Sequence, residues 1–228
     1  MEPAIRKGEA ELLRSAVARS PAAVNNRCME IQGWDERYRS GRAEERETEP
    51  NPLLVEICSK LPAGKALDLA CGAGRNAMWL AQRGWSVTAV DGAPTAIEIL
   101  RRRASEGGVA VDARIFDLEK RGFEIEESCW DLIAMCFYLQ TSLFEPAKRG
   151  VRPGGIVLAI VHIAENGEEP TGHRLRPGEL RQYFSGCEIL HYYEGKSNDP
   201  AHKRPVAEIV AKTYLMNASI GPSAPLRG

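Results

Sequence analysis

The sequence predicts an α/β protein in which a doubly wound, mostly parallel sheet of seven strands carries helices on both faces. Apolar runs of strand length alternate with helix-like segments along most of the chain. A glycine-rich turn, Cys71 to Gly74, follows the first of these runs. The last two runs are joined by the loop 195–205, which is too short for a helical crossover, so the last strand is expected to be antiparallel.

The first part of the sheet is predicted between residues 52 and 116. In chain order we expect a helix at 52–61, a strand at 65–70, a helix at 74–83, a strand at 86–91, a helix from Pro94 to about Ser105 and a strand at 110–116. Pro62 and Gly64 end the first helix, and Pro94 suits the first turn of the third.

The second part of the sheet is predicted between residues 130 and 215. In chain order we expect a strand at 130–136, a helix at 141–149, a strand at 156–162, a helix at 177–184, and strands at 187–194 and 206–215. The segment 165–176 is polar and contains glycine and proline, which is typical of a loop.

One main domain, residues 30–216, is expected, with an amino-terminal extension at 1–29 and a carboxyl-terminal tail at 217–228. Apolar residues at helical spacing favour a short amphipathic helix in the extension, and a segment loose in solution is the alternative. The stretch 33–52 is polar, and its charge run, 42–49, is interpreted as a solvated loop.

Composition is typical of an ordinary soluble enzyme. We expect the protein to be cytoplasmic and to be a monomer or a homodimer. The 228 residues carry a formal net charge of −1, so nothing indicates a nucleic-acid or anionic-membrane partner. No apolar run of about 18 residues and no signal-peptide core is present. The six cysteines form no C-x-x-C pair, so free thiols are expected and a metal site is not.

The glycine turn is the centre of a Rossmann-like strand–turn–helix–strand unit that predicts a nucleotide ligand. Gly72 and Gly74 let the backbone approach a ligand closely, and the helix behind them begins with free N–H groups. Asp91 ends the second strand, where its carboxylate can accept two hydrogen bonds from a ribose diol.

Two ligands fit this unit at first sight. The run Gly72 to Ala77 matches the dinucleotide pattern G-x-G-x-x-G/A, so an NAD-dependent oxidoreductase is one alternative. Asp68 argues against it, because it lies inside the first strand, where a pyrophosphate over the turn would meet a negative charge. S-Adenosylmethionine, which has an amino group, a sulfonium and no phosphate, suits that acid better.

Five motifs in order resemble those of the class I S-adenosylmethionine-dependent methyltransferases. They are the strand, acid and G-x-G of residues 67–74, the strand ending in an acid at 87–91, the pair Asp117-Leu118, the strand opening with an acid at 130–136, and the Pro-Gly-Gly turn and strand of 151–158. Residues 34–38, 49–52 and 174–180 are further similar to tellurite-resistance and thiopurine methyltransferases.

The resemblance implies a set of cofactor contacts along the carboxyl ends of the strands. Asp68 is expected to meet the methionine amino group, and a carboxylate that only ties down the glycine turn is its alternative. Asp117 would bond the adenine amino group. Arg75 would bond the methionine carboxylate, unless it is a surface arginine. The full predicted cofactor set is Trp34, Tyr38, Asp68, Ala70, Gly72, Gly74, Arg75, Asp91, Gly92, Asp117, Leu118 and Cys136.

The candidate catalytic residues are His162 and Tyr38. Tyr38 and Trp34 offer aromatic faces to a sulfonium, as a lid over the cofactor, although Trp34 is equally an anchor for the amino-terminal segment. His162 ends the fifth strand, where it suits a general base for a hydroxyl or amine acceptor. We expect methyl transfer to a small molecule such as a thiol or a metalloid, which needs no strong base; a non-catalytic cofactor-binding module is a further alternative.

Overall fold

The computed structural model describes residues 31–41, 48–120, 122–165, 167–169 and 172–213. The helix expected within 1–29, the tail 217–228 and most of the charge run 42–49 lie outside these residues. Among the residues that it covers, no helix is long and apolar enough to cross a membrane.

A seven-stranded sheet forms the centre of the molecule, with the strand order β3-β2-β1-β4-β5-β7-β6. The strands are β1 (Lys65–Leu69), β2 (Ser86–Asp91), β3 (Val111–Ile115), β4 (Trp130–Cys136), β5 (Val151–His162), β6 (Glu188–Lys196) and β7 (Pro205–Lys212). Strand β7 is antiparallel to both of its neighbours, β5 and β6. The pairings among β1 to β5 are parallel, so the predicted fold class and the antiparallel last strand are confirmed.

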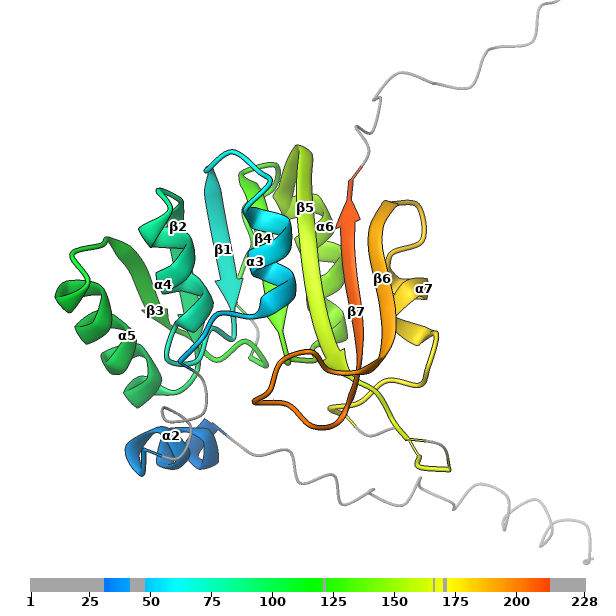
Figure 1. The fold of residues 1–228 in the computed structure, drawn as a ribbon, viewed down its shortest axis with the longest axis horizontal. Helices are drawn as coiled ribbons and strands as arrows, with labels where there is room; N and C mark the ends of the chain where they lie inside the picture. Colours follow the sequence, from blue (N-terminus) through cyan, green and yellow to red (C-terminus); the bar gives the residue numbers. More distant parts are fainter. Residues whose placement is uncertain (1–30, 42–47, 121, 166, 170–171, 214–228) are drawn as a thin grey trace, which may run out of the picture.

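Helices cover both faces of this sheet (Figure 1). They are α2 (Ile31–Arg39), α3 (Pro52–Cys58), α4 (Arg75–Gln82), α5 (Pro94–Glu106), α6 (Phe144–Gly150), which a 3-10 turn at Thr141–Leu143 precedes, and α7 (Glu179–Tyr183). Helices α3, α4 and α5 pack on one face, and α6 and α7 pack on the other. Helix α2 belongs to neither layer and lies below the sheet, against α5.

Strand β4 shows why the central strands are continuous apolar runs in the sequence. Leu132 and Ala134 pack into the cluster beneath α3 to α5, whereas Ile133 and Met135 pack into the cluster on the α6 face. All four side chains are fully buried. A strand that is covered on both faces shows no polar alternation, because neither side meets water.

Among the differences from the sequence prediction are one missed helix and two shifted element ends. Helix α2 was missed: the stretch 33–52 was described only as polar, with no helix in it, but Asp35 and Tyr38 are buried against the domain. Helix α3 ends at Cys58 instead of residue 61, because Ser59 closes it through its backbone N–H. Strand β5 begins at Val151, since Val151 pairs with Trp130 ahead of a register shift.

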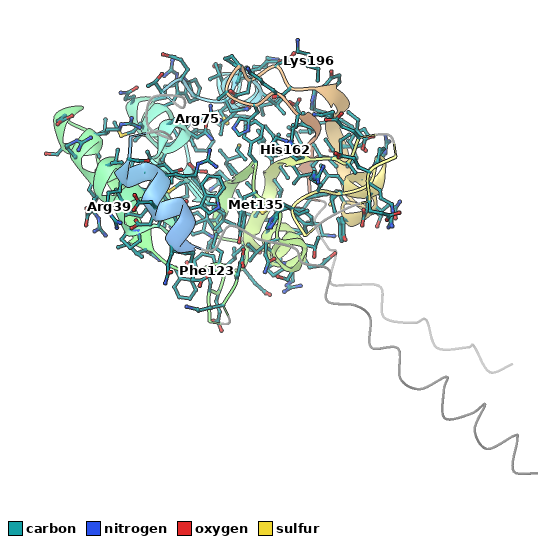
Figure 2. The ribbon with its side chains drawn as sticks, turned by 90° about the horizontal axis from the view of Figure 1, so that it is seen from below. Arg39, Arg75, Phe123, Met135, His162 and Lys196 are labelled. Atoms are coloured by element: carbon teal, nitrogen blue, oxygen red, sulfur yellow. The ribbon has the colours of Figure 1, made fainter. Side chains whose placement is uncertain are left out.

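The carboxyl ends of the parallel strands meet below the sheet in the orientation of Figure 1. The chain order reverses between β1 and β4, because β2 and β3 lie on one side of β1 and the later strands lie on the other. A crevice opens at such a switch point in doubly wound sheets. Figure 2 looks onto this edge and shows α2 lying across it.

Candidate functional site

A cavity of about 380 Å³ lies at the switch point. It falls in the size range of small-molecule sites. It brings together most of the residues that the sequence singled out, from five strand ends and from α2. The predicted residues among its lining are Trp34, Tyr38, Ala70, Gly72, Arg75, Asp91, Gly92, Asp117, Leu118, Cys136 and His162. Asp68 and Gly74 do not line it.

The two turn glycines have different surroundings. Gly72 has φ +55°, and a Cβ on it would overlap the hydroxyl of Tyr38, so only glycine leaves room beneath α2. Gly74 has φ +79°, and a Cβ there would overlap the side chain of Leu100 on α5. Gly72 therefore opens the backbone toward the cavity, whereas Gly74 is required for the turn and for helix packing.

Asp91 is held rigidly at the end of β2. Its Oδ2 accepts a hydrogen bond from the Gly72 N–H at 2.8 Å, and its Oδ1 accepts one from the Ala93 N–H at 2.8 Å. Burial raises the pKa of this carboxyl, and these backbone hydrogen bonds oppose the rise. Since a carboxylate has about four acceptor positions and the backbone N–H groups of Gly72, Gly92 and Ala93 act on this one, acceptor capacity remains for a ligand hydroxyl.

Asp68 lies on β1, does not line the cavity and is 1 % exposed. Its Oδ2 has no hydrogen-bond partner among the described residues. Burial raises the pKa of Asp68 to about 7, against the lowering effect of Arg75. A buried acceptor without a donor is costly, so this atom fits a ligand that brings a positive or donor group.

Arg75, the first residue of α4, is not a surface arginine, because it is only 9 % exposed. Its Nη2 forms an ion pair with Asp199 Oδ2 at 2.7 Å, and its Nη1 donates to the Glu49 carbonyl at 3.1 Å. Although burial opposes the effect, Arg75 holds the pKa of Asp199 below its ordinary value. A contact between Arg75 and a cofactor carboxylate stays a prediction.

A buried polar network surrounds this ion pair, and sequence reasoning missed it. The Asn51 N–H donates to Asn76 Oδ1 at 2.8 Å, and Asn51 Nδ2 donates to Asp199 Oδ2 at 3.3 Å. Asn51 Oδ1 also caps α3 through the N–H groups of Leu53 and Leu54. The network joins the segment before α3, the start of α4 and the β6–β7 loop, which no local sequence pattern brings together.

Helix α2 covers the cavity through two residues of different character. Tyr38 is 7 % exposed, whereas Trp34 is 41 % exposed and carries the guanidinium of Arg37 over its ring, 4.8 Å from the centroid. Asp35 Oδ1 accepts the Thr95 N–H at the start of α5, at 2.7 Å. Asp35 and Tyr38 thus anchor this segment, and both roles weighed for Trp34, lid and anchor, stay predictions.

The adenine end expected from the sequence lies beyond β3. Asp117 and Leu118 both line the cavity, and Leu118 is buried. Asp117 Oδ1 accepts the Glu119 N–H at 3.1 Å, and its Oδ2 lies 3.2 Å from Lys120 Nζ. Asp117 is thus tied into its own loop, which fixes the direction of its carboxylate.

The opposite end of the cavity is built from aromatic rings and imidazoles. The rings of Phe137 and His202 are stacked, with centroids 3.3 Å apart and an interplanar angle of 2°. The His162 ring lies 5.4 Å from that of His202. His202 comes from the β6–β7 loop, which the sequence analysis treated only as a connection, so this residue was missed.

Burial changes the protonation of the histidines at this end. It lowers the pKa of His202 to about 4, although Asp199 opposes the shift. Burial also lowers the pKa of His162, whose Nδ1 has no hydrogen-bond partner among the described residues. Both imidazoles are therefore neutral at pH 7. Within the described part of the chain, no three His, Cys, Asp or Glu residues are grouped to hold a metal ion.

Comparison with known proteins identifies related sequences. A family model described as "Tellurite resistance protein TehB" matches residues 36–204. The chain is 33% identical over 205 residues to a ubiquinone biosynthesis O-methyltransferase of Xylella fastidiosa, covering 77% of this chain and 82% of that protein. It is 28% identical over 155 residues to hemagglutinin 1 of Eikenella corrodens, covering 64% of this chain and about half, 51%, of that protein.

The fold also matches solved structures. The crystal structure of TehB from Haemophilus influenzae superposes with a TM-score of 0.64 at 20% sequence identity, covering 78% of this chain and 67% of that one. At this identity the likeness concerns the fold, and the family rests on the match over residues 36–204.

Proposed function

The chain belongs to the TehB family of S-adenosylmethionine-dependent methyltransferases, and we propose that it methylates a small-molecule acceptor inside the cavity at the switch point. The observation that carries the proposal is the pairing of Asp91 with the Gly72 N–H beside the opening left by that glycine. A rigid carboxylate next to open backbone is suited to a ribose diol.

The residues of the cavity suit the cofactor from one end to the other. Asp91 would hold the ribose, and Asp117 and Leu118 would hold the adenine, with Gly92 beside it. The partnerless Oδ2 of Asp68 would receive the amino group, directly or through a water molecule. Ala70, Arg75 and Cys136 surround the space between these groups and the acceptor end.

When bound, S-adenosylmethionine supplies a methyl group on a sulfonium, which an acceptor attacks in line with the leaving sulfur. The chain's own contribution is to position both partners, which can supply several kcal/mol of the barrier reduction. Tyr38 and Trp34 lie over the cavity from α2, where their rings favour a nearby cation by on the order of 1 kcal/mol and help to exclude water.

The acceptor is a small molecule in this proposal, because a cavity of about 380 Å³ that α2 partly covers has little room for more. A thiol or a metalloid would need no strong base. A hydroxyl, the acceptor type in the name of the Xylella fastidiosa relative, would need one, and the neutral imidazole of His162 is placed at the cavity to serve.

Turnover with labelled cofactor tests the proposal. The protein is incubated with S-adenosylmethionine that carries a deuterated methyl group and with panels of thiols, phenols and metalloid oxyanions, and mass spectrometry follows both the labelled product and S-adenosylhomocysteine. Equal formation of the two products is expected for at least one acceptor. Binding of the cofactor without turnover in any panel would favour the non-catalytic module instead.

A redox function has less support. The NAD-dependent alternative rested on the match of Gly72 to Ala77 with a dinucleotide pattern, but membership of a methyltransferase family accounts for the same glycines. The buried, partnerless Asp68 also disfavours a pyrophosphate above the turn. NADH serves as the negative control in the binding experiments below.

A further inference from the structure

The cavity has two ends of different chemistry. Asp91 at the end of β2 and His162 at the end of β5 are separated by three strand spacings, since the order is β2-β1-β4-β5. Three spacings of about 4.8 Å correspond to roughly 14 Å. If Asp91 holds the ribose, the end at His162 lies beyond the reactive part of the cofactor, where an acceptor must bind.

We propose that Phe137, His162 and His202 form the acceptor subsite, and that this subsite selects a flat, uncharged aromatic phenol or thiol over an oxyanion. This inference rests on the proposed methyltransferase function and adds the class of acceptor to it. It also departs from the metalloid alternative that the sequence left open.

The shape of the subsite favours a flat ring. Phe137 follows β4 directly and adopts a φ of +61°, a rare conformation for a residue with a bulky side chain. Its ring stacks on His202, and the His162 ring is tilted by 40° against His202. Flat π-faces at fixed angles bind aromatic rings through stacked or edge-to-face contacts, worth about 0.5–1.5 kcal/mol each beyond burial.

The charge of the subsite disfavours an anion. Arg75 is the charged lining residue that reaches these rings, with its guanidinium 5.7 Å from the centroid of the Phe137 ring. Its charge is neutralised by the buried ion pair with Asp199. An oxyanion that enters such a place loses its hydration without gaining a countercharge, which is costly.

Two arginines that do not line the cavity leave the subsite unfavourable for an anion. Arg174 and Arg204 act on His162 electrostatically and contribute to the lowering of its pKa. Arg174 is paired with Glu168, and Arg204 is exposed to solvent, where salt screens it. The neutral imidazoles themselves carry no charge that would hold an anion.

The neutral imidazoles also suit the proton balance of the reaction. As the acceptor oxygen or sulfur forms its bond to the methyl carbon, the bond from that carbon to the sulfonium breaks and its electron pair stays on sulfur. The proton of the phenol or thiol must then leave. A neutral His162 can accept that proton and pass it to solvent, whereas a protonated imidazole cannot.

Nuclear magnetic resonance of the imidazole groups tests the subsite without requiring turnover. The protein, saturated with S-adenosylhomocysteine, is titrated separately with phenol, cyclohexanol and selenite at pH 7. Phenol is expected to shift the side-chain resonances of His162 and His202 in a saturable manner, and cyclohexanol at least tenfold more weakly. Selenite is expected to leave them in place.

Variants show where the phenol binds. His202→Ala should weaken phenol binding at least tenfold while the affinity for S-adenosylhomocysteine changes less than twofold. The matched control is His191→Ala, which removes an imidazole of β6 that does not line the cavity. If His202→Ala does not fold, Ala201→Trp fills the same subsite from the loop and should block phenol equally.

Other outcomes overturn the inference. Selenite shifts that match or exceed those of phenol would mean that the subsite binds anions. A failure of phenol to move either resonance in the cofactor-saturated protein would mean that no aromatic subsite exists there. Absence of S-adenosylhomocysteine binding in the same samples would instead overturn the proposed function, so the two failures are distinguishable.

Discussion

Arg75 and Asp199 form a buried ion pair at 2.7 Å, with side chains that are 8% and 2% exposed. Arg75 begins the helix behind the glycine turn, and Asp199 lies in the β6–β7 loop that carries His202. The pair therefore connects the proposed cofactor end of the cavity to the proposed acceptor end. Its removal should affect both the stability of the domain and the position of His202.

Asp199→Ala is expected to destabilise the protein by about 3–5 kcal/mol, because it leaves the Arg75 guanidinium buried without its partner. Asp199→Asn, which keeps a hydrogen-bond acceptor, should cost less. Chemical denaturation measures both values. Glu56→Ala is the matched control, since it removes the exposed pair with Lys60 and should change the unfolding free energy far less than Asp199→Ala does. Similar effects of Asp199→Ala and Glu56→Ala would show that burial of the Arg75 pair does not matter.

Asp68 makes the stability of the cofactor-free protein depend on pH. Its pKa is about 7 in the folded protein, against an ordinary value of 3.8 for an aspartate. Below pH 3.8 the Asp68 carboxyl is protonated in both the folded and the unfolded state, so it does not change the free energy of unfolding. As the pH rises from 3.8 to 7 only the unfolded state ionises, so the native state loses stability, on the order of 4 kcal/mol by pH 8. Asp68→Asn should therefore stabilise the protein at pH 8 and not at pH 4, as measured by denaturation.

The same group should govern the pH dependence of cofactor binding. An ionised Asp68 attracts the ammonium group of S-adenosylhomocysteine, so the affinity should rise severalfold between pH 6 and pH 8 in the wild-type protein. In Asp68→Asn it should be nearly constant over that range. Calorimetric titrations at three pH values measure this, and a parallel rise in both proteins would contradict the assignment of Asp68.

Asp35 should control the docking of α2. Asp35→Ala removes the acceptor for the Thr95 N–H, a hydrogen bond to a charged group worth about 1.5–3 kcal/mol. Faster amide exchange in residues 31–39 and a severalfold loss of affinity for S-adenosylhomocysteine are expected. Glu36→Ala, one position along the helix and exposed, is the control and should change neither. Unchanged exchange in Asp35→Ala would show that α2 is held by other contacts.

Ala70 directly follows β1 and adopts a left-handed conformation, with φ +54°. Ala70→Val should destabilise the protein by about 1–3 kcal/mol, because a β-branched residue is strongly disfavoured there. Ala70→Gly should change the unfolding free energy by less than about 1 kcal/mol, since glycine adopts this φ freely while losing one methyl group. Equal losses in the two variants, measured by thermal denaturation, would contradict the strain at this position.

The sheet and most of its helices could be predicted, because local patterns encode them. The predicted strand 130–136 matches β4, whose centre, Leu132 to Met135, is apolar on both faces. Asp91 and Gly72 could be found because their roles follow from their positions at the end of a strand and in the turn. These residues belong to elements whose direction is fixed by the sheet.

The parts that were missed depend on contacts between distant segments. Helix α2 is polar and short, and its order comes from the contact of its Asp35 with the Thr95 N–H at the start of α5, which no local pattern shows. The burial of Arg75 depends on Asp199, which is far away in the chain. His202 reaches the cavity only because the β6–β7 loop folds back over the sheet. No spacing rule within one segment contains that information.

Calorimetric titration with S-adenosylhomocysteine, comparing the wild-type protein with Asp91→Ala, tests the central claim most directly. Asp112→Ala, an exposed acid on the neighbouring strand β3, is the control, and NADH is the control ligand. The account predicts micromolar binding to the wild-type and Asp112→Ala proteins, at least a tenfold loss in folded Asp91→Ala, and no binding of NADH. Binding of NADH alone, or equal affinity in Asp91→Ala, would contradict it.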